Sequence, residues 1–338
     1  MNDRAVNLLE NYDIEVLRTA KGRGAILCEA KQGYYIFKEY SGPQSKLKVQ
    51  DEVLKTVSKE CKVPVEQLVT TKEGELFVKD GEQTAYILKS YFSGRECNVR
   101  DMEDCRQAMR TLARLHKVMR IPVEHCEDFC QVFRIDAEYE KHNKELRKVR
   151  RFLRERSQKT DFELFLLGHY DFFLEKAIQV TEELLSYDME KECMHTLAQG
   201  YICHGDYQYH NLLKNDKKMA VINFEKIVRD NPVRDLYLFL RKLLEKNNWN
   251  TELGSELISV YQKENPLSAH DCVQLYYRFA YPEKFWKIVN FYYNSGKAWI
   301  PEKNMEKLRK VIEGERNKQE FLDSIFSIIA KSEDGFSI

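Results

Sequence analysis

The segment from residue 202 to 213 constrains the fold of this chain more than any other stretch of the sequence. It reads Ile-Cys-His-Gly-Asp-Tyr-Gln-Tyr-His-Asn-Leu-Leu, so an acid, Asp206, and an amide, Asn211, stand five residues apart between two apolar runs. Short apolar runs that flank a polar loop are typical of strand ends. The sequence therefore predicts a loop between strands that holds both polar side chains at one corner.

A second apolar run follows this corner after a turn at residues 215–217. It extends from Met219 to Phe224 and is expected to pair with the preceding run as a β-hairpin. The pairing would bring Asn223 and Glu225 close to Asn211. The hairpin thus predicts one cluster of polar side chains drawn from two separate loops.

The side chains in this cluster suit phosphoryl transfer. That reaction needs a carboxylate that accepts a proton from, or orients, the acceptor hydroxyl, and oxygen ligands for a metal that bridges the nucleotide phosphates. We interpret Asp206 as the candidate catalytic residue and Asn211, Asn223 and Glu225 as candidate metal ligands. Kinases place a metal-binding Asp at the position of Asn223. Taken alone, the same string also suits an ordinary strand-loop-strand corner.

The order of the other elements supports a kinase-like fold. Alternating apolar residues and turn signals over the first ninety residues predict strands and one amphipathic helix, whereas the pattern is helical from Asn98, the predicted N-cap, onward. The predicted strands are 14–20, 25–30, 34–40, 75–79 and 84–91. The predicted helices are 45–59, one after Asn98, and then about 136–156, 162–187, 232–247, 251–263, 268–292 and 302–331.

This order predicts an α+β chain with the bilobal, protein-kinase-like arrangement. We expect residues 1–92 to form an N-lobe with a five-stranded antiparallel sheet and one helix. Residues 93–338 are expected to form a mainly helical C-lobe, which contains the catalytic-loop hairpin at 201–225.

Four residues of the predicted N-lobe are candidates for contact with a nucleotide. Lys38 lies in the middle of a predicted strand, from which a cation can reach phosphates, and Glu52 on the following helix is placed to pair with it. Gly22 and Gly24 stand at a turn that would let the backbone approach a phosphate. The alternatives are an edge-strand lysine and an ordinary strand turn.

Two further places have a role in the same picture. Ser90 and Tyr91 begin the segment that joins the predicted lobes, and this segment would offer backbone groups to an adenine ring, unless it is only a linker. Asp235 lies in the first turn of a predicted helix, near enough to the catalytic loop to orient it. An Asp that stabilises the helix dipole is an equally good account of that residue.

Composition argues against several other classes of protein. Lys and Arg together number 54, as do Asp and Glu, so no net charge attracts nucleic acid or a membrane surface. Nowhere do eighteen apolar residues run together, and the start Met1-Asn2-Asp3-Arg4 continues with mixed polar residues, so we expect neither a membrane span nor a signal peptide. The nine cysteines are scattered without a CxxC pair, which is typical of reduced thiols in a cytosolic protein.

Several blocks of the sequence match the pattern of a known family. The most specific are His204 to Asn211 and Val221 to Glu225, and the others are Gly22-Arg23-Gly24, Tyr35 to Lys38, Tyr91 to Cys97 and Leu112 to His116. With these blocks the chain resembles, over nearly its whole length, the CotS-type spore coat proteins of endospore-forming bacteria. These are relatives of aminoglycoside phosphotransferases and of choline or homoserine kinases. The resemblance implies the aminoglycoside phosphotransferase type of fold.

The resemblance also implies a place and partners for the protein. It implies a protein of the mother-cell cytoplasm that later joins the spore coat, with other spore coat proteins as partners; the balanced charge of the chain argues against nucleic acid as a further partner. If activity is retained, it implies ATP and Mg²⁺ as cofactors and a small hydroxylated or amino metabolite as phosphoryl acceptor. If activity is lost, it implies no cofactor.

The departure from the family pattern is Asn223. Active relatives are expected to carry Asp there, and Mg²⁺ prefers a carboxylate to an amide. Glu225 is two residues further along an extended strand, so it points the same way and offers a longer substitute. Two functions therefore stay open: a coat protein with a degenerate kinase-like scaffold, and an ATP-dependent phosphotransferase.

Overall fold

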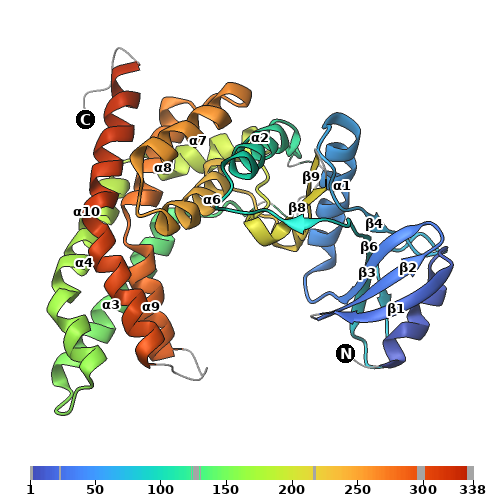
Figure 1. The fold of residues 1–338 in the computed structure, drawn as a ribbon, viewed down its shortest axis with the longest axis horizontal. Coiled ribbons are helices and arrows are strands. Elements are labelled where there is room, and N and C mark those ends of the chain that lie inside the picture. The colour runs from blue at the N-terminus through green and yellow to red at the C-terminus, as the bar shows by residue number, and fades with distance from the viewer. Residues whose placement is uncertain are drawn as a thin grey trace. The chain divides into compact units, whose positions relative to one another are not determined.

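The strands of the first ninety residues form one antiparallel sheet. The computed structural model describes residues 3–22, 24–122, 124, 129, 131–215, 218–294 and 301–332. The strands are β1 (Val16–Gly22), β2 (Ala25–Ala30), β3 (Gly33–Glu39), β4 (Leu68–Val69), β5 (Val78–Lys79) and β6 (Ala85–Ser90). They pair in the order β1-β2-β3-β6-β4, and β5 also pairs with β6 (Figure 1). The sheet has one strand more than predicted, because β4 is too short for an alternating pattern to show.

The two faces of this sheet have different surroundings. One face packs against the 3-10 helix η1 (Asp3–Asn11) and the residue after it, through the buried side chains Leu9, Tyr12, Ile26, Cys28, Phe37, Tyr86 and Leu88. Side chains alternate along a strand, so the intervening residues point to the opposite face. On that face Ile36 has Leu27 beside it on β2 and Lys89 beside it on β6. Lys38 and Lys89 therefore lie on the same face of the sheet.

The predicted hairpin is present. Strands β8 (Leu212–Asn215) and β9 (Lys218–Val221) pair antiparallel, and the short strand β7 (Arg95–Glu96) pairs with β8. The 3-10 turns η4 (Tyr209–Asn211) and η5 (Phe224–Lys226) adjoin the same end of the hairpin. The hairpin thus fixes the end of the predicted catalytic loop beside the residues that follow β9.

By its internal contacts the chain divides into two units. One comprises Met1–Val132, Thr196–Phe239 and Val260–Pro266, and it contains both sheets with helices α1 (Gln44–Glu60) and α2 (Met102–Val118). The other comprises Phe133–His195, Leu240–Ser259 and Leu267–Ile338. Its helices are α3 (Ile135–Glu155), α4 (Asp161–Leu185), α8 (Ala269–Ala280), α9 (Glu283–Asn294) and α10 (Pro301–Ser332), while α5 (Met189–Ala198), α6 (Val233–Lys246) and α7 (Thr251–Glu264) cross the unit boundaries. The predicted lobes 1–92 and 93–338 divide the chain differently and stay a prediction.

The start of α2 differs from the prediction. Asn98 is not its N-cap, because the carboxylate of Asp101 accepts the N–H groups of Glu103 and Asp104 at 2.9 and 3.3 Å. The side chain of Asn98 instead accepts the N–H of Arg100 in the turn before the helix. Both residues are good caps by type, so sequence alone did not separate them.

The helices of the second unit also correct the prediction in two places. The helix predicted over 268–292 is two helices, α8 and α9, because Tyr281 before Pro282 is extended, as residues before proline prefer. The helix α5 was not predicted, since its buried positions include the polar Glu192 and Thr196 and the apolar stripe is weak. Stacked rings fill this unit, such as Tyr139 on Tyr281 with centroids 3.7 Å apart.

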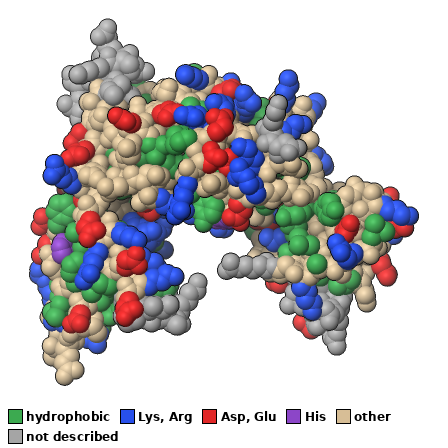
Figure 2. All heavy atoms as spheres, in the orientation of Figure 1, with side chains coloured by type: hydrophobic (Ala, Val, Ile, Leu, Met, Phe, Trp, Pro, Cys, Tyr) green, Lys and Arg blue, Asp and Glu red, His purple; other side chains and the backbone are tan. Residues whose placement is uncertain are grey.

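The charged side chains are mixed over the surface. On the face shown in Figure 2, Lys and Arg lie interspersed with Asp and Glu, in keeping with 54 residues of each sign. Within the described part of the chain, no helix has the length and apolar character needed to cross a membrane.

Candidate functional site

Asp235 fixes the backbone of the predicted catalytic loop. Its carboxylate, on α6, accepts the N–H of His204 at 2.5 Å and that of Gly205 at 2.9 Å, and its side chain is fully buried. Burial alone would raise the pKa of Asp235, but the hydrogen bond from His116 and the nearby imidazoles lower the pKa below its usual range. The carboxylate therefore stays charged inside the protein, and the role predicted for Asp235 in orienting the loop is confirmed.

The loop has little freedom around its glycine. Gly205 has a φ of +76°, and a Cβ on it would stand 2.0 Å from the carbonyl oxygen of Lys226. Nδ1 of His204 accepts a hydrogen bond from the N–H of Asp206 at 3.1 Å. The ring proton of His204 is therefore on Nε2, which donates to the carbonyl of Ile222 at 3.0 Å. These contacts bring the loop against the backbone that follows β9.

Asp206, the candidate catalytic residue, lies at the tip of this loop. Its carboxylate accepts the ammonium of Lys226 at 2.8 Å and a side-chain N–H of Gln208. The side chain of Lys226 is two-thirds exposed, whereas that of Asp206 is mostly buried. An ion pair with such an exposed, solvated partner is weak, so an incoming hydroxyl could displace Lys226 from the carboxylate.

The candidate metal ligands Asn211 and Asn223 meet directly. The amide N–H of Asn223 donates to Oδ1 of Asn211 at 2.9 Å, and the amide N–H of Asn211 donates to the carbonyl of Asp206 at 2.8 Å. Asn223 adopts the left-handed conformation, with a φ of 67°, which Asn tolerates better than most residues. The convergence expected from the hairpin is therefore observed, but the two amides bond to each other.

Two residues of this site were not predicted. Lys89, on β6, is fully buried, and its ammonium contacts Glu66 at 2.8 Å, Glu225 at 2.6 Å and Oδ1 of Asn223 at 3.1 Å. Glu66 also accepts the N–H groups of Asn223 and Phe224 at 2.8 and 3.0 Å. One signal was available in the sequence: a lysine two residues after Ile87 in an apolar strand must share its buried face.

Glu225 lies between two ammonium groups. It contacts Lys89 at 2.6 Å and Lys38 at 3.1 Å. Burial would raise the pKa of Glu225, but Lys89 and then Lys38 lower the pKa to about 2. For Lys89, burial lowers the pKa, but Glu66 and Glu225 outweigh it and leave the pKa raised. Lys38 is thus paired with Glu225, while its predicted pairing with Glu52 on α1 stays a prediction.

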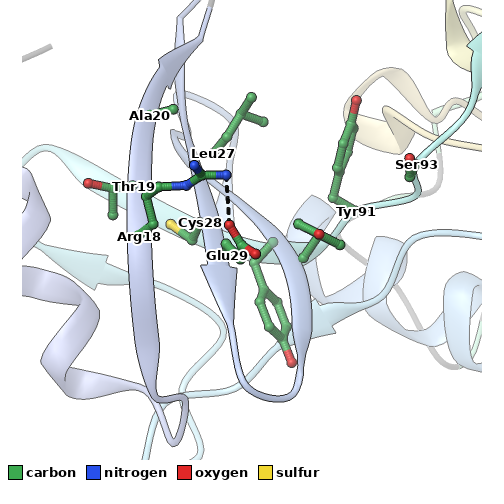
Figure 3. A pocket seen from close by; sticks show the side chains of 10 residues that line it. Arg18, Thr19, Ala20, Leu27, Cys28, Glu29, Tyr91 and Ser93 are labelled. Carbon is green, nitrogen blue, oxygen red and sulfur yellow. Dashed lines mark ion pairs between the residues drawn. The ribbon is translucent and has the colours of Figure 1, made fainter.

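A pocket of about 300 Å³ adjoins the same sheet (Figure 3). Leu27 and Tyr91 line it, together with Arg18 and Glu29, which form an ion pair of 2.9 Å between β1 and β2. The volume is at the lower end of the range for small-molecule pockets. Leu27 is on the face that also carries Lys38, so this face offers an apolar recess as well as an ammonium group.

The remaining candidates for nucleotide contact take part in the pairing and turns of the sheet. The N–H of Ser90 donates to the carbonyl of Gln67 at 2.9 Å and that of Tyr91 to the carbonyl of Tyr34 at 2.8 Å, so neither donor is available to a base. Gly24, with a φ of +69°, supplies the turn between β1 and β2, and Gly22 pairs with Ala25 across it. Arg23 between them lies outside the described residues. Contact of these four residues with a nucleotide stays a prediction.

The arrangement around Asn223 does not fit a divalent cation. Oδ1 of Asn211 accepts an N–H of Asn223, and Oδ1 of Asn223 accepts the ammonium of Lys89. Glu225, the expected substitute ligand, is engaged by two ammonium groups. In the described part of the chain, no three side chains of His, Cys, Asp or Glu are grouped so that they could hold a metal. As folded, the three predicted ligands therefore bind protein groups.

The comparisons with known proteins agree with this architecture. A family model described as "Spore coat putative kinase YutH" matches residues 5–325. The chain belongs to this family. Spore coat protein S of Bacillus subtilis (strain 168) is 24% identical over 274 residues, which cover 80% of this chain and 77% of that protein. The family resemblance drawn from the sequence blocks is confirmed.

Solved structures show the fold to be that of aminoglycoside phosphotransferases. The aminoglycoside phosphotransferase from Alicyclobacillus acidocaldarius is similar with a TM-score of 0.83 at 18% identity, covering 96% of this chain and 95% of that one. Spectinomycin phosphotransferase APH(9)-Ia, in complex with ADP and spectinomycin, is similar with a TM-score of 0.67 at 13% identity, covering 94% and 99%. The predicted α+β kinase-like fold is therefore confirmed.

Proposed function

We propose that this protein is a spore coat-associated protein whose kinase-like scaffold has lost its metal site. The observation that carries the proposal is the bond of 3.1 Å from the buried ammonium of Lys89 to Oδ1 of Asn223. A kinase keeps a carboxylate and a metal at that position. Membership of a spore coat kinase family, and the likeness to Spore coat protein S, support the place of action.

The charge balance of the site supports the same proposal. The ammonium groups of Lys38 and Lys89 offset the carboxylates of Glu66 and Glu225 within one set of contacts. Asp206 is offset separately by Lys226. A divalent cation needs uncompensated oxygen ligands, usually with net negative charge. The folded site offers none to an incoming ion without first breaking one of these pairs.

The proposal predicts where the protein acts. A fluorescent fusion of the full chain should appear in the mother-cell cytoplasm during sporulation and then around the forespore, with other coat proteins as its partners. The matched variant is Asp206→Asn, which removes the candidate catalytic carboxylate, and it should localise as the wild type and leave the spore coat intact. Fluorescence in vegetative cells with none at the spore would contradict coat association. Normal localisation with a defective coat in the variant would favour catalysis.

A second function is favoured by the pocket. We propose it as the alternative: an ATP-dependent phosphotransferase that acts on a small hydroxylated or amino metabolite, with Asp206 orienting the acceptor. The pocket of about 300 Å³ adjoins the sheet face of Lys38, and Asp206 is already held in a fixed loop. The similar spectinomycin phosphotransferase was solved with ADP. In this reading, Mg²⁺ must displace Lys89 from Asn223 when the nucleotide binds.

Calorimetry with ATP separates the two functions. We expect the affinity of the wild type for ATP to change less than about twofold on addition of Mg²⁺, because the candidate ligands are engaged within the protein. Lys38→Met should abolish any ATP binding, whereas Lys31→Met, a change at an exposed lysine paired with Glu15, should not alter it. A rise in affinity of about tenfold or more with Mg²⁺, equal to about 1.4 kcal/mol, would favour the phosphotransferase.

A further inference from the structure

The buried ammonium of Lys89 has a complete set of acceptors. An ammonium group has three N–H donors, and Lys89 directs them to Glu66 at 2.8 Å, Glu225 at 2.6 Å and Asn223 at 3.1 Å. None of its side chain is exposed to solvent. The three acceptors are two carboxylates and an amide oxygen, which come from two separate parts of the chain, Glu66 from one and Asn223 and Glu225 from the other. Lys89 is thus held as a cation in a cage of protein oxygens.

The same cage has the chemistry of a divalent cation site. Mg²⁺ and Mn²⁺ are bound in proteins by carboxylate and carbonyl oxygens. Glu225 and Asn223 belong to the segment where a kinase holds its metal, and Glu66 bonds to the backbone of that segment at 2.8 and 3.0 Å. We propose that Lys89 is the resident cation of this site: its ammonium takes the place of a divalent ion, and its removal would leave a site that binds Mg²⁺ or Mn²⁺.

Lys89 also determines how the two amides face each other. An ammonium can bond only to the oxygen of the Asn223 amide, so the NH₂ group of that amide must point away from Lys89. It points to Oδ1 of Asn211, at 2.9 Å, and occupies that oxygen too. One lysine therefore accounts for the engagement of both predicted amide ligands. Without Lys89, the Asn223 amide could rotate, so that its oxygen and Oδ1 of Asn211, which the bond from Asn211 to the carbonyl of Asp206 keeps in place, face the same ion.

A second buried lysine shows that burial alone does not create such a site. Lys318 on α10 is also buried, but its ammonium donates to the backbone carbonyls of Ala280 and Tyr281 at 3.3 and 3.4 Å. Burial lowers the pKa of Lys318 to about 8, whereas the carboxylates around Lys89 keep the pKa of Lys89 raised. Lys318 is therefore a matched control, with a buried ammonium but no pair of bonded carboxylates.

The test is rescue of a lysine variant by a metal ion. Lys89→Ala removes the ammonium and opens room for an ion. It should lower the melting temperature of the full chain, because the buried Glu66 loses its ion-pair partner and Glu225 keeps only Lys38. Millimolar Mn²⁺ should then raise the melting temperature of this variant by about 5 °C or more. The wild type should shift by less than about 1 °C under the same conditions. Lys318→Ala should also be destabilised but should gain nothing from Mn²⁺.

Two additional variants distinguish a metal site from a general salt effect. Lys89→Met removes the charge but fills the space, so Mn²⁺ should rescue it less than Lys89→Ala. Lys89→Ala combined with Glu225→Gln removes a ligand and should lose the rescue. If Lys89→Ala is insoluble without metal, refolding with and without Mn²⁺ is compared, and recovery only with Mn²⁺ has the same meaning.

Other results would overturn the proposal. Equal stability of Lys89→Ala with and without Mn²⁺ would make Lys89 a structural ion pair only. The proposal would also be wrong if the wild type bound Mn²⁺ and Glu225→Gln lost that binding. The metal and the ammonium of Lys89 would then occupy the site together, and Lys89 would not take the place of the ion. The proposal rests on the kinase-like reading of the site, but its readout is protein stability. It can therefore fail while coat association holds, and coat association can fail while metal rescue is observed.

Discussion

Gly205→Ala is expected to destabilise the predicted catalytic loop by about 3–5 kcal/mol. The backbone of Gly205 has a φ of +76°, which L-residues with a side chain rarely adopt, and the new Cβ would stand 2.0 Å from the carbonyl oxygen of Lys226. A backbone atom cannot move aside as a flexible side chain can. The loop and the turn after β9 must separate, which also disturbs the Asp206–Lys226 pair of 2.8 Å.

Hydrogen exchange is the suitable measurement for this variant. Trp249 follows α6 and Trp286 is on α9, both outside the predicted catalytic loop, so their fluorescence reports on other parts of the chain. Cys203 and Val228 bond to each other through both backbone amides at 2.8 and 3.1 Å, beside the loop. Their exchange should accelerate about a hundredfold or more in Gly205→Ala. In Gly81→Ala, where a Cβ would meet nothing within 4 Å, these amides should exchange as in the wild type.

Asp235→Ala is expected to cost a similar amount, about 3–5 kcal/mol, for a different reason. The substitution leaves the buried N–H of His204 and the partly buried N–H of Gly205 without an acceptor, and each buried group left so costs about 1–3 kcal/mol. It also removes a buried charge that His116 contacts at 3.4 Å. Urea denaturation followed by circular dichroism should show the loss, and the amides of Cys203 and Val228 should again lose protection.

Asp101→Ala is the matched control for Asp235→Ala. Asp101 also accepts two backbone N–H groups, at 2.9 and 3.3 Å, but at the exposed start of α2. Water can replace the carboxylate there, so the expected cost is about 1 kcal/mol, as for other N-caps. Equal costs for the two variants would show that burial of the Asp235 contacts has no importance, and the account of the loop would be wrong.

Much of the architecture follows from local patterns in the sequence. The turn at residues 215–217, between two apolar runs, predicted the β8–β9 hairpin, and with it the meeting of Asn211 and Asn223, which lie 2.9 Å apart in the structure. The long helices α3, which has a strong apolar stripe, and α4, which is rich in apolar residues, were predicted within a few residues. These features depend on contacts between residues that are close in sequence.

What escaped prediction depends on contacts that are distant in sequence. Lys89 is 134 residues from Asn223, and Glu66 is 157 residues from it. Read locally, Lys89 is one charge at the end of an apolar strand, and Glu66 is one acid before a strand of two residues. Nothing in either neighbourhood indicates that both side chains meet at the end of β9. The residues that give this site its charge balance therefore appear only in the folded chain.

The ammonium of Lys89 has a consequence for how this site can evolve. Asn and Asp codons differ by a single base, so mutation regularly offers Asn223→Asp. With Lys89 present, however, that change puts a carboxylate oxygen where an N–H now donates to Asn211 at 2.9 Å. It also places a third carboxylate around the single ammonium of Lys89. Loss of Lys89 first would leave the buried Glu66 without its ion-pair partner and close to Glu225. Each single step is disadvantageous before the other has occurred, so the two positions are epistatic. Lys89 therefore makes the gain of a carboxylate at position 223 depend on a change at a second position.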